Sequence, residues 1–447
     1  MKKLSRRKAI KLFLGSSSLL STSLIPGLYP MQALGSGASS KKLLHIFLKG
    51  GWDSHLAIDP VRGTKKLLKD GGVFADQYED SSHAVPGKSN LFVGNGLQAA
   101  IPALTNVPTC FINGMDMEIT AHELAVNYMF SGVSSLSRSR EYPALLARMG
   151  AAAAHFPPHG VLGGVIPLDT TKISAPPIFG TSISAFSAML GGPYNTPIDG
   201  SMFDRAHALI QKLDDIRTKK LSEKRKNREL AWFASQSQLN ELYAKNLGSE
   251  FNVNPEPSTS EMDALRAAYN CSNGYDQSSH MLGAYLIMRS GLTPFLTVSI
   301  DGFDTHSNHF SSHTSLMTNF AQQLNRLVSD MMTTDDPDQA GKKLIDTTNI
   351  IITSEFVRTP SLNATQGTDH WQSASAIVMG PGVADNRIIG ATDDNARPLG
   401  WNGTNAEAKN ELNSILPEHL LAAVLYNFGF MAEADELSDR RLDGVFA

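Results

Sequence analysis

SIDGFDTHSNH (residues 299–309) and IITSEFVRTPSLNATQGTDHW (residues 351–371) are the segments that decide the fold of this 447-residue chain. Each contains the end of a short apolar run, Phe295–Ile300 or Thr348–Thr353, which has the length and composition of a buried β-strand. Each run then gives way abruptly to Asp, Glu, Arg and His. Carboxylates and imidazoles at the carboxyl ends of buried strands indicate a metal-binding or hydrolytic site.

Apolar runs alternate with helical patterns along most of the chain. Further runs of strand length are Leu43–Lys49, Thr109–Asn113, Val161–Leu168 and Ser375–Met379. Helical spacing or alanine-rich composition is found in Ala121–Phe130, Tyr142–Ala154, Met281–Ser290, His313–Met332 and Pro417–Phe428. Alternation of this kind, with strands that are apolar throughout, predicts an α/β protein with a mostly parallel central sheet and helices on both faces.

The middle of the chain differs in character. Residues 202–246 form a charged helical stretch, and mixed-sign runs of this kind are typical of solvated helix faces. Residues 250–260 are polar and contain two prolines, which indicates a linker or an exposed loop. We therefore expect one α/β domain over residues 39–447, with a helical insertion at about residues 200–280.

The first 38 residues resemble a twin-arginine export signal. The paired Arg6 and Arg7 precede a moderately apolar stretch, Leu12–Leu34, and a run of small residues offers a cleavage site near Ala38. Serines, a proline and a glycine interrupt the apolar stretch, so no stable membrane span is expected after signal removal. The sequence thus predicts a periplasmic or extracellular protein that contacts the twin-arginine translocation machinery; an ordinary basic N-terminus is the alternative.

The charge balance argues against nucleic-acid partners. The net charge of −4 includes six basic residues and no acidic ones in residues 1–38, so the remainder is clearly acidic, with 33 basic and 43 acidic side chains. Phosphate contacts need a basic footprint, which such a chain lacks. Cys110 and Cys271 could form one disulfide in an oxidising compartment or remain two separate buried thiols.

Two motifs that follow predicted strands offer candidate ligands. Asp53 comes after Gly50-Gly51, where a glycine turn can approach a bound ion closely. Asp304, His306 and His309 lie within six residues, and alternate residues of an extended segment point the same way, so Asp304 and His306 can converge on one ion. The alternatives are a turn or helix-capping role for Asp53 and a polar loop with solvated histidines.

Two further motifs lie in the second segment. Glu355 directly follows a strand and could bind a metal, while Arg358 could pair with it or clamp an anionic substrate bidentately. Asp369 and His370 supply two ligand types on adjacent residues. Carboxylates mixed with imidazoles suit Zn²⁺, Mn²⁺ or Fe better than an all-oxygen Ca²⁺ or Mg²⁺ site. A purely structural Glu–Arg ion pair is the alternative.

The order of these motifs resembles the domain of unknown function 1501 family. That bacterial family is often exported by the twin-arginine route and belongs with the alkaline phosphatase and sulfatase superfamily. The matching motifs are FLKGGWDSH, GLTPFLTVSIDGFDTHSNH, ITSEFVRTP and GTDHW, extended by VMGPGV and IIGATDD. The resemblance covers roughly residues 43–430, and it is specific because the motifs occur together and in order.

The resemblance implies an alkaline-phosphatase-like fold that holds one or two divalent metals. By position, it implies a metal shell of Asp53, Asp304, His306, His309, Glu355, Asp369 and His370. The superfamily normally places a nucleophilic Ser, Thr or modified Cys at a helix start after the second strand. This chain has Ala121-His122 where the family usually has Ser-His, so Thr120 or water would attack instead.

These observations favour an exported metal-dependent hydrolase of phosphate or sulfate esters. Its substrate would be a small anionic ester held by Arg358, and His122 could serve as acid or base. The alternative is a non-catalytic envelope protein that keeps the fold as a scaffold for binding or assembly, which Ala121 favours. An exported redox enzyme is disfavoured because no Gly-rich dinucleotide motif or haem-attachment sequence is present.

Overall fold

The computed structural model describes residues 41–62, 78, 82–133, 159–164, 178–191, 247–248, 250–256, 258–410 and 413–447. The predicted export signal, the predicted helix Tyr142–Ala154 and the charged stretch 202–246 lie outside these residues. Of the predicted strand Val161–Leu168, the structure describes β5 (Gly160–Leu162) and the two residues after it. Among the helices it describes, none combines the length and the apolar character that crossing a membrane requires.

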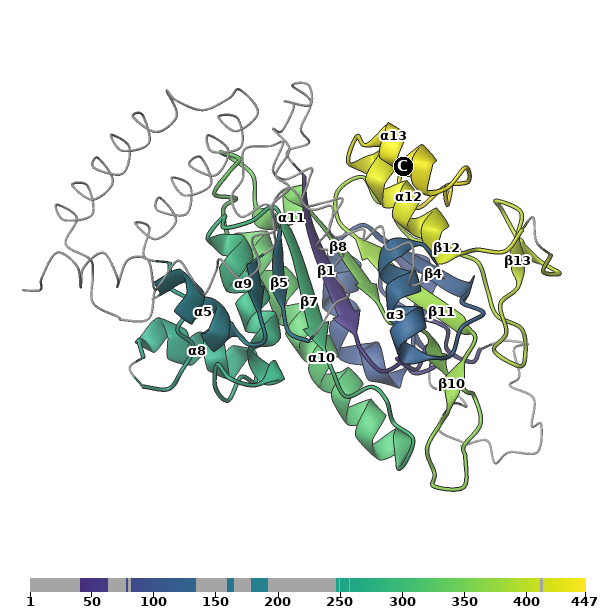
Figure 1. Cartoon of the computed structure of the whole chain (residues 1–447), viewed down its shortest axis with the longest axis horizontal. Coiled ribbons are helices and arrows are strands. Elements are labelled where there is room, and N and C mark those ends of the chain that lie inside the picture. The colour runs from purple at the N-terminus through teal and green to yellow at the C-terminus, as the bar shows by residue number, and fades with distance from the viewer. Residues whose placement is uncertain are drawn as a thin grey trace, which may run out of the picture.

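An eight-stranded sheet forms the centre of the described part of the molecule (Figure 1). Its strands lie in the order β12 (Arg387–Ile389), β4 (Thr109–Asp116), β11 (Ser373–Met379), β8 (Thr348–Thr353), β1 (Lys42–Leu48), β7 (Phe295–Ile300), β5 and β6 (Ile178–Gly180). All neighbouring pairs are parallel except those of β11 with β4 and β8. The predicted α/β class with a mostly parallel sheet is therefore confirmed.

The reversed strand β11 has a simple cause. A strand can join its neighbour in parallel only through a crossover connection, usually a helix. The chain between β8 and β11 contains only the short antiparallel strands β9 (Val357–Arg358) and β10 (His370–Trp371) and the loop between them. It stays at the carboxyl end of β8, so β11 enters the sheet from that end and runs back.

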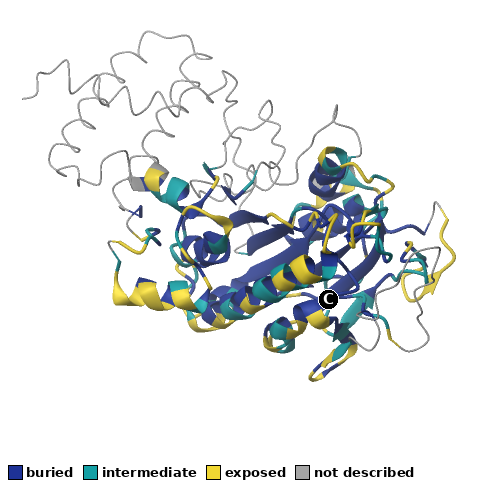
Figure 2. Ribbon diagram, turned by 90° about the horizontal axis from the view of Figure 1, so that it is seen from below, coloured by how far each residue is buried: buried dark blue, intermediate teal, exposed yellow. Residues whose placement is uncertain are grey.

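Helices cover both faces of the sheet. On one face, α9 (His280–Arg289) and α10 (His309–Thr333) share a core with Leu44 and Ile46 of β1. On the other, α3 (His122–Ser131) and α12 (Pro417–Asn427) share a core with Phe47. Figure 2 shows the buried sheet and the exposed outer side of α10. Alternate β1 residues thus pack against the helices on opposite faces of the sheet, which is why that strand is apolar nearly throughout.

The remaining elements are short. They are β2 (His83–Val85), β3 (Lys88–Val93), η2 (Asn95–Ala100), α2 (Ile101–Asn106), α5 (Ile183–Gly191), α8 (Ser260–Ala268), η4 (Gln277–Ser279), α11 (Leu344–Thr347), β13 (Gly400–Trp401), β14 (Ala406–Glu407) and α13 (Met431–Leu437).

The two cysteines are separate thiols. Cys110 and Cys271 are both free and buried. Cys110 belongs to the core that contains Phe47, and Cys271 to the core that contains Leu44, so the sheet lies between them. Of the two arrangements that the sequence leaves open, the structure has the unpaired one.

His45 gives the fold a testable pH dependence. It lies in the middle of β1, fully buried, with Nε2 2.8 Å from the hydroxyl of Thr353. Burial lowers the pKa of His45 to about 3. Below about pH 6.5 the unfolded chain therefore binds a proton that the folded protein excludes, and stability falls with falling pH. We expect His45→Gln to reduce this loss by up to about 1.4 kcal/mol per pH unit between pH 6.5 and 4.5. Urea titrations at both pH values measure the effect, and equal pH slopes for the two proteins would contradict it.

Candidate metal centre

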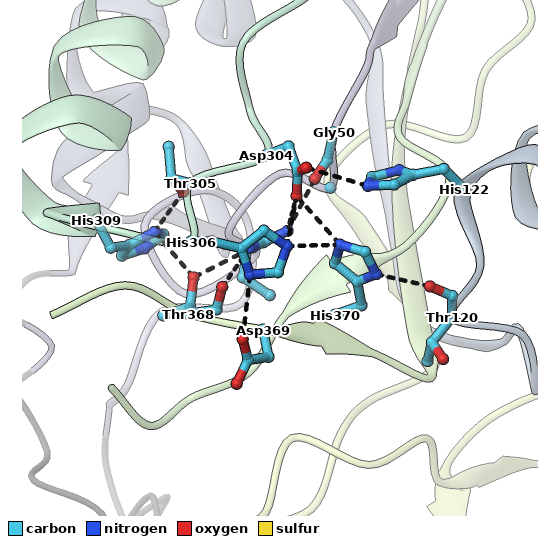
Figure 3. A network of polar contacts seen from close by, with 12 residues as sticks. Gly50, Thr120, His122, Asp304, Thr305, His306, His309, Thr368, Asp369 and His370 are labelled. Carbon is cyan, nitrogen blue, oxygen red and sulfur yellow. Dashed lines mark hydrogen bonds and ion pairs between the residues drawn. The ribbon is translucent and has the colours of Figure 1, made fainter. Parts of the chain in front are cut away.

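Three neighbouring strands end at the same level of the sheet. Leu48 of β1 pairs with Ile300 of β7, and Phe47 of β1 pairs with Thr353 of β8. The segments that continue from these strands therefore meet at one edge, as expected for the carboxyl ends of parallel strands. The β9–β10 loop and the start of α3 join them there, and Figure 3 shows the resulting polar network.

Asp304 lies at the centre of this network. Its Oδ1 is 2.8 Å from Nη1 of Arg358, 3.0 Å from Nε2 of His306 and 3.1 Å from Nε2 of His370. Its Oδ2 is 3.3 Å from Nε2 of His122. Partial burial disfavours the charged carboxylate, but the neighbouring His370 and Arg358 outweigh it and lower the pKa of Asp304. The carboxylate is thus held ionised among three imidazoles.

The other ring nitrogen of each imidazole has an acceptor of its own. His122 Nδ1 is 2.8 Å from Oε1 of Glu355, His306 Nδ1 is 3.1 Å from Oδ1 of Asp369, and His370 Nδ1 is 2.7 Å from the carbonyl oxygen of Thr120. A carbonyl or carboxylate accepts only from a protonated nitrogen, so these contacts assign the ring proton to Nδ1. In each neutral ring, the lone pair of Nε2 then faces Asp304.

This arrangement has the features of a metal site. One donor atom from each of His122, Asp304 and His370 lies within 4.8 Å of the other two. Nε2 of His306 is 3.0 Å from Nε2 of His370, and buried Nε2 of His122 has no hydrogen-bond partner among the described residues. Converging lone pairs repel one another unless a proton or a cation lies between them. Histidine ligands commonly donate their second nitrogen to a carboxylate or carbonyl, as all three rings do here.

Glu355 lies behind His122. Its side chain is fully buried, and Oε1 also accepts from the amide of Gly50 at 2.9 Å, while Oε2 accepts from the hydroxyl of Ser354 at 3.0 Å. The hydrogen bond to Glu355 raises the pKa of His122, and the charges of Glu355 and Asp304 add to it despite burial. Glu355 thus orients the ring and increases its basicity, which strengthens it as a ligand.

Phe356 packs against two of the rings. Its ring centroid is 4.9 Å from that of His122 and 4.5 Å from that of His370. The side chain is fully buried. It follows Glu355 directly, so the turn after β8 supplies both the polar partner and the apolar support of His122. Side chains held in this way lose little freedom when they bind a ligand.

Asp53 and His309 lie in a separate, buried cluster. Oδ2 of Asp53 accepts from Nε2 of His309 at 2.8 Å and from the hydroxyl of Tyr78, and Oδ1 accepts from the amide of His55 at 2.8 Å. Burial opposes the charged form, but the hydrogen bond and charge of His309 lower the pKa of Asp53 well below its usual range. The sequence predicts both residues in the shell of Asp304; the structure places them apart from it.

The start of α10 explains the position of His309. The sequence predicts a helix from His313, but α10 begins four residues earlier, after Asn308, whose φ of +47° is left-handed. His309 and His313 are therefore one turn apart on the buried side of the helix. Asp304 and His306 precede the helix in irregular backbone, and both side chains face the site, whereas that of His309 does not.

Arg358 lies between the two clusters with a fully buried side chain. Besides Asp304, Nη1 donates to the carbonyl of Gly50 at 3.0 Å, Nε donates to the hydroxyl of Thr368 at 3.2 Å, and Nη2 donates to the Thr368 carbonyl. Its donors are thus turned to protein groups beneath the site. An anion clamp, the role predicted from the sequence, needs donors that face a ligand.

The region after β4 contributes main-chain and imidazole groups. Thr120 offers its carbonyl to His370, whereas its hydroxyl lies on the other side of the residue (Figure 3). Ala121 is the N-cap of α3, and His122 begins the helix. Sequence reasoning named His122 only as an acid or base, and it missed Tyr78, which no motif marks. The acceptors of His122 and His370 come from distant segments and leave no local pattern.

The fold and the cluster define an α/β protein with a candidate histidine–carboxylate metal centre at the carboxyl ends of its central strands. The chain belongs to the family described as "Protein of unknown function (DUF1501)", whose sequence profile matches residues 40–408. The family predicted from the motifs is therefore confirmed. Comparison with curated proteins gave no match.

Two solved structures are distantly similar. One is the crystal structure of Ps i-CgsB in complex with k-i-k-neocarrahexaose, with a TM-score of 0.43 and 7% identity, covering 90% of this chain and 75% of that chain. The other is alkaline phosphatase from the Antarctic bacterium TAB5, with a TM-score of 0.30 and 12% identity, covering 80% and 95%. TM-scores of this size establish no relation in function. The α/β class follows from the sheet itself.

Proposed function

We propose that this protein is an exported metal-dependent hydrolase of phosphate or sulfate esters. The observation that supports it best is the convergence of three Nε2 atoms on Asp304, with each Nδ1 held by its own acceptor. We assign His122, Asp304, His306 and His370 as ligands, with Glu355 and Asp369 as the groups that orient two of the imidazoles. This donor set suits Zn²⁺, Mn²⁺ or Fe.

A divalent metal in this position would lower the pKa of a coordinated water and polarise the ester oxygen. The chain's own residues favour water over a side chain as nucleophile. Ala121 has no hydroxyl, and the hydroxyl of Thr120 lies away from the imidazoles (Figure 3). Nε2 of His122 cannot serve as both ligand and acid–base group, and its position beside Asp304 favours the ligand role. Arg358 would hold Asp304 in position from the buried side of the site, and the metal would bind the substrate anion.

An assay of aryl phosphates and aryl sulfates tests the reaction class. With Zn²⁺ or Mn²⁺ added, we expect turnover by the folded protein that His306→Ala lowers by at least about 100-fold, because loss of a ligand should exceed the 10–100-fold cost of losing an outer partner. Near-UV circular dichroism verifies that the variant is folded. Absence of turnover on the whole panel, with metal bound, would instead favour the non-catalytic scaffold that Ala121 suggests.

Export rests on the sequence of residues 1–38. We propose that the paired Arg6 and Arg7 direct the folded protein to the twin-arginine translocation machinery. Changing both to Lys keeps the charge and the apolar stretch, so only recognition of the pair is lost. Cell fractionation should then find the variant in the cytoplasm and the wild type in the periplasm or medium. Normal export of the Lys–Lys variant would contradict this route.

A further inference from the structure

We infer that the centre holds a single divalent cation, and that the guanidinium of Arg358 fills the position that a second cation would require. This inference rests on the proposed metal centre. Among the described residues, three groups on the far side of Arg358 that could bind a second ion are Asp53, His309 and His313. All three are buried, and they are joined to one another in a closed network of hydrogen bonds.

Asp53 has donors on both oxygens. Oδ1 accepts from the amides of His55 and Leu56, at 2.8 and 3.3 Å. Oδ2 accepts from Nε2 of His309 and from the hydroxyl of Tyr78. Only 1% of its side chain is exposed. A carboxylate that accepts this many hydrogen bonds has little capacity left for a metal ion.

Both histidines of the network are also engaged at both nitrogens. Nδ1 of His309 is 2.7 Å from the hydroxyl of Thr305 and 3.0 Å from that of Thr368. Nε2 of His313 accepts from the amide of Asp53 at 2.8 Å, and its Nδ1 is 3.0 Å from the hydroxyl of Thr305. An ion could enter this cluster only by breaking several of these contacts in a buried region, where unsatisfied polar groups are costly.

The guanidinium of Arg358 separates this cluster from the proposed centre. Nη1 is 2.8 Å from Oδ1 of Asp304, and Nε is 3.2 Å from the hydroxyl of Thr368, which itself contacts His309. The fixed positive charge therefore lies between Asp304 and Asp53. It is the direct countercharge of Asp304, and it repels any further cation in that space.

Metal stoichiometry of the folded full-length protein tests the inference. After chelation and reloading with Zn²⁺ or Mn²⁺, equilibrium dialysis with elemental analysis should give one ion per chain. Bound Mn²⁺ should show an electron paramagnetic resonance spectrum without coupling to a second ion. Asp53→Asn should still bind one ion, with affinity changed by less than about tenfold, because outer partners of ligands cost 10–100-fold and Asp53 is more remote. His370→Ala should lose the ion.

The outcomes separate this inference from the proposed function. Two ions in the wild type, falling to one in Asp53→Asn, would overturn the inference and leave the metal centre standing. No bound ion in the wild type would remove the metal centre and the inference with it.

The role of the charge on Arg358 is tested directly. Arg358→Gln should weaken binding of the first ion, because Asp304 loses its partner. At saturating Mn²⁺ it should admit a second ion beside Asp304, in the space next to the Gly50 carbonyl and Thr368 that the guanidinium fills in the wild type. Arg326→Gln is the control, because Arg326 pairs with Asp330 on α10 and contacts neither carboxylate. A single ion in Arg358→Gln at saturation would show that its charge does not exclude a second one, and would overturn the inference.

Discussion

Asp304→Asn is expected to weaken binding of Zn²⁺ or Mn²⁺ by at least about 100-fold, and to lower ester turnover at a fixed metal concentration accordingly. In the described part of the chain, Asp304 is the carboxylate that lies beside the Nε2 atoms of His122, His306 and His370. The amide keeps the shape of the side chain but removes its negative charge. Competition with a chromophoric chelator measures the affinity, and elemental analysis of the dialysed protein measures occupancy.

Two matched variants locate the effect. Asp301→Asn removes a carboxylate from the same loop that is 58% exposed and pairs with Lys49 at 3.0 Å, away from the imidazoles. We expect it to leave metal affinity unchanged. Glu355→Gln removes the charged acceptor of His122 Nδ1 without removing a proposed ligand, so its effect should be intermediate, about 10–100-fold. Equal affinities for Asp304→Asn and Asp301→Asn would exclude Asp304 from the metal shell.

The strands could be predicted because the apolar runs that mark them in the sequence are also what burial on both faces of the sheet requires. Phe295–Ile300 and Thr348–Thr353 begin and end where the apolar runs do. Both strands are buried on both faces, so every position must be apolar or able to hydrogen-bond internally, and the run itself marks the strand. The placement of Asp304 and Glu355 at one edge follows from the same parallel arrangement.

The composition of each cluster could not be read from the sequence. Asp53 lies beyond a strand and a glycine turn, as a metal ligand would, yet Tyr78 and His309 both donate to its Oδ2. Those partners come from distant segments, and spacing along the chain carries no information about them. His309 was also misplaced, because α10 begins earlier than the sequence predicts and carries His309 on its buried side. Helix boundaries depend on capping geometry that the sequence indicates weakly.

Gly50→Ala is expected to destabilise the protein by about 2–6 kcal/mol and to abolish metal binding. Gly50 has a φ of +119°, a region that is nearly closed to other residues, which alone costs on the order of 1–3 kcal/mol. A Cβ at this position would lie 2.2 Å from the amide nitrogen of Asp304 and 2.6 Å from the carbonyl carbon of Phe303. Overpacking of this kind adds about 1–3 kcal/mol, and backbone atoms cannot rotate away.

Gly50→Ala should also disrupt the metal site, because the backbone of Gly50 forms hydrogen bonds with residues of that site. Its amide donates to Glu355 and its carbonyl accepts from Arg358, so displacing the turn moves the partners of both His122 and Asp304. Gly87→Ala is the control: its φ is +76°, but a Cβ there would meet nothing within 4 Å, so only about 1 kcal/mol of backbone strain is expected. Urea unfolding and metal dialysis of both variants provide the comparison. If Gly50→Ala lost no more stability than Gly87→Ala, the close approach of this turn to Asp304 would not be part of the folded protein.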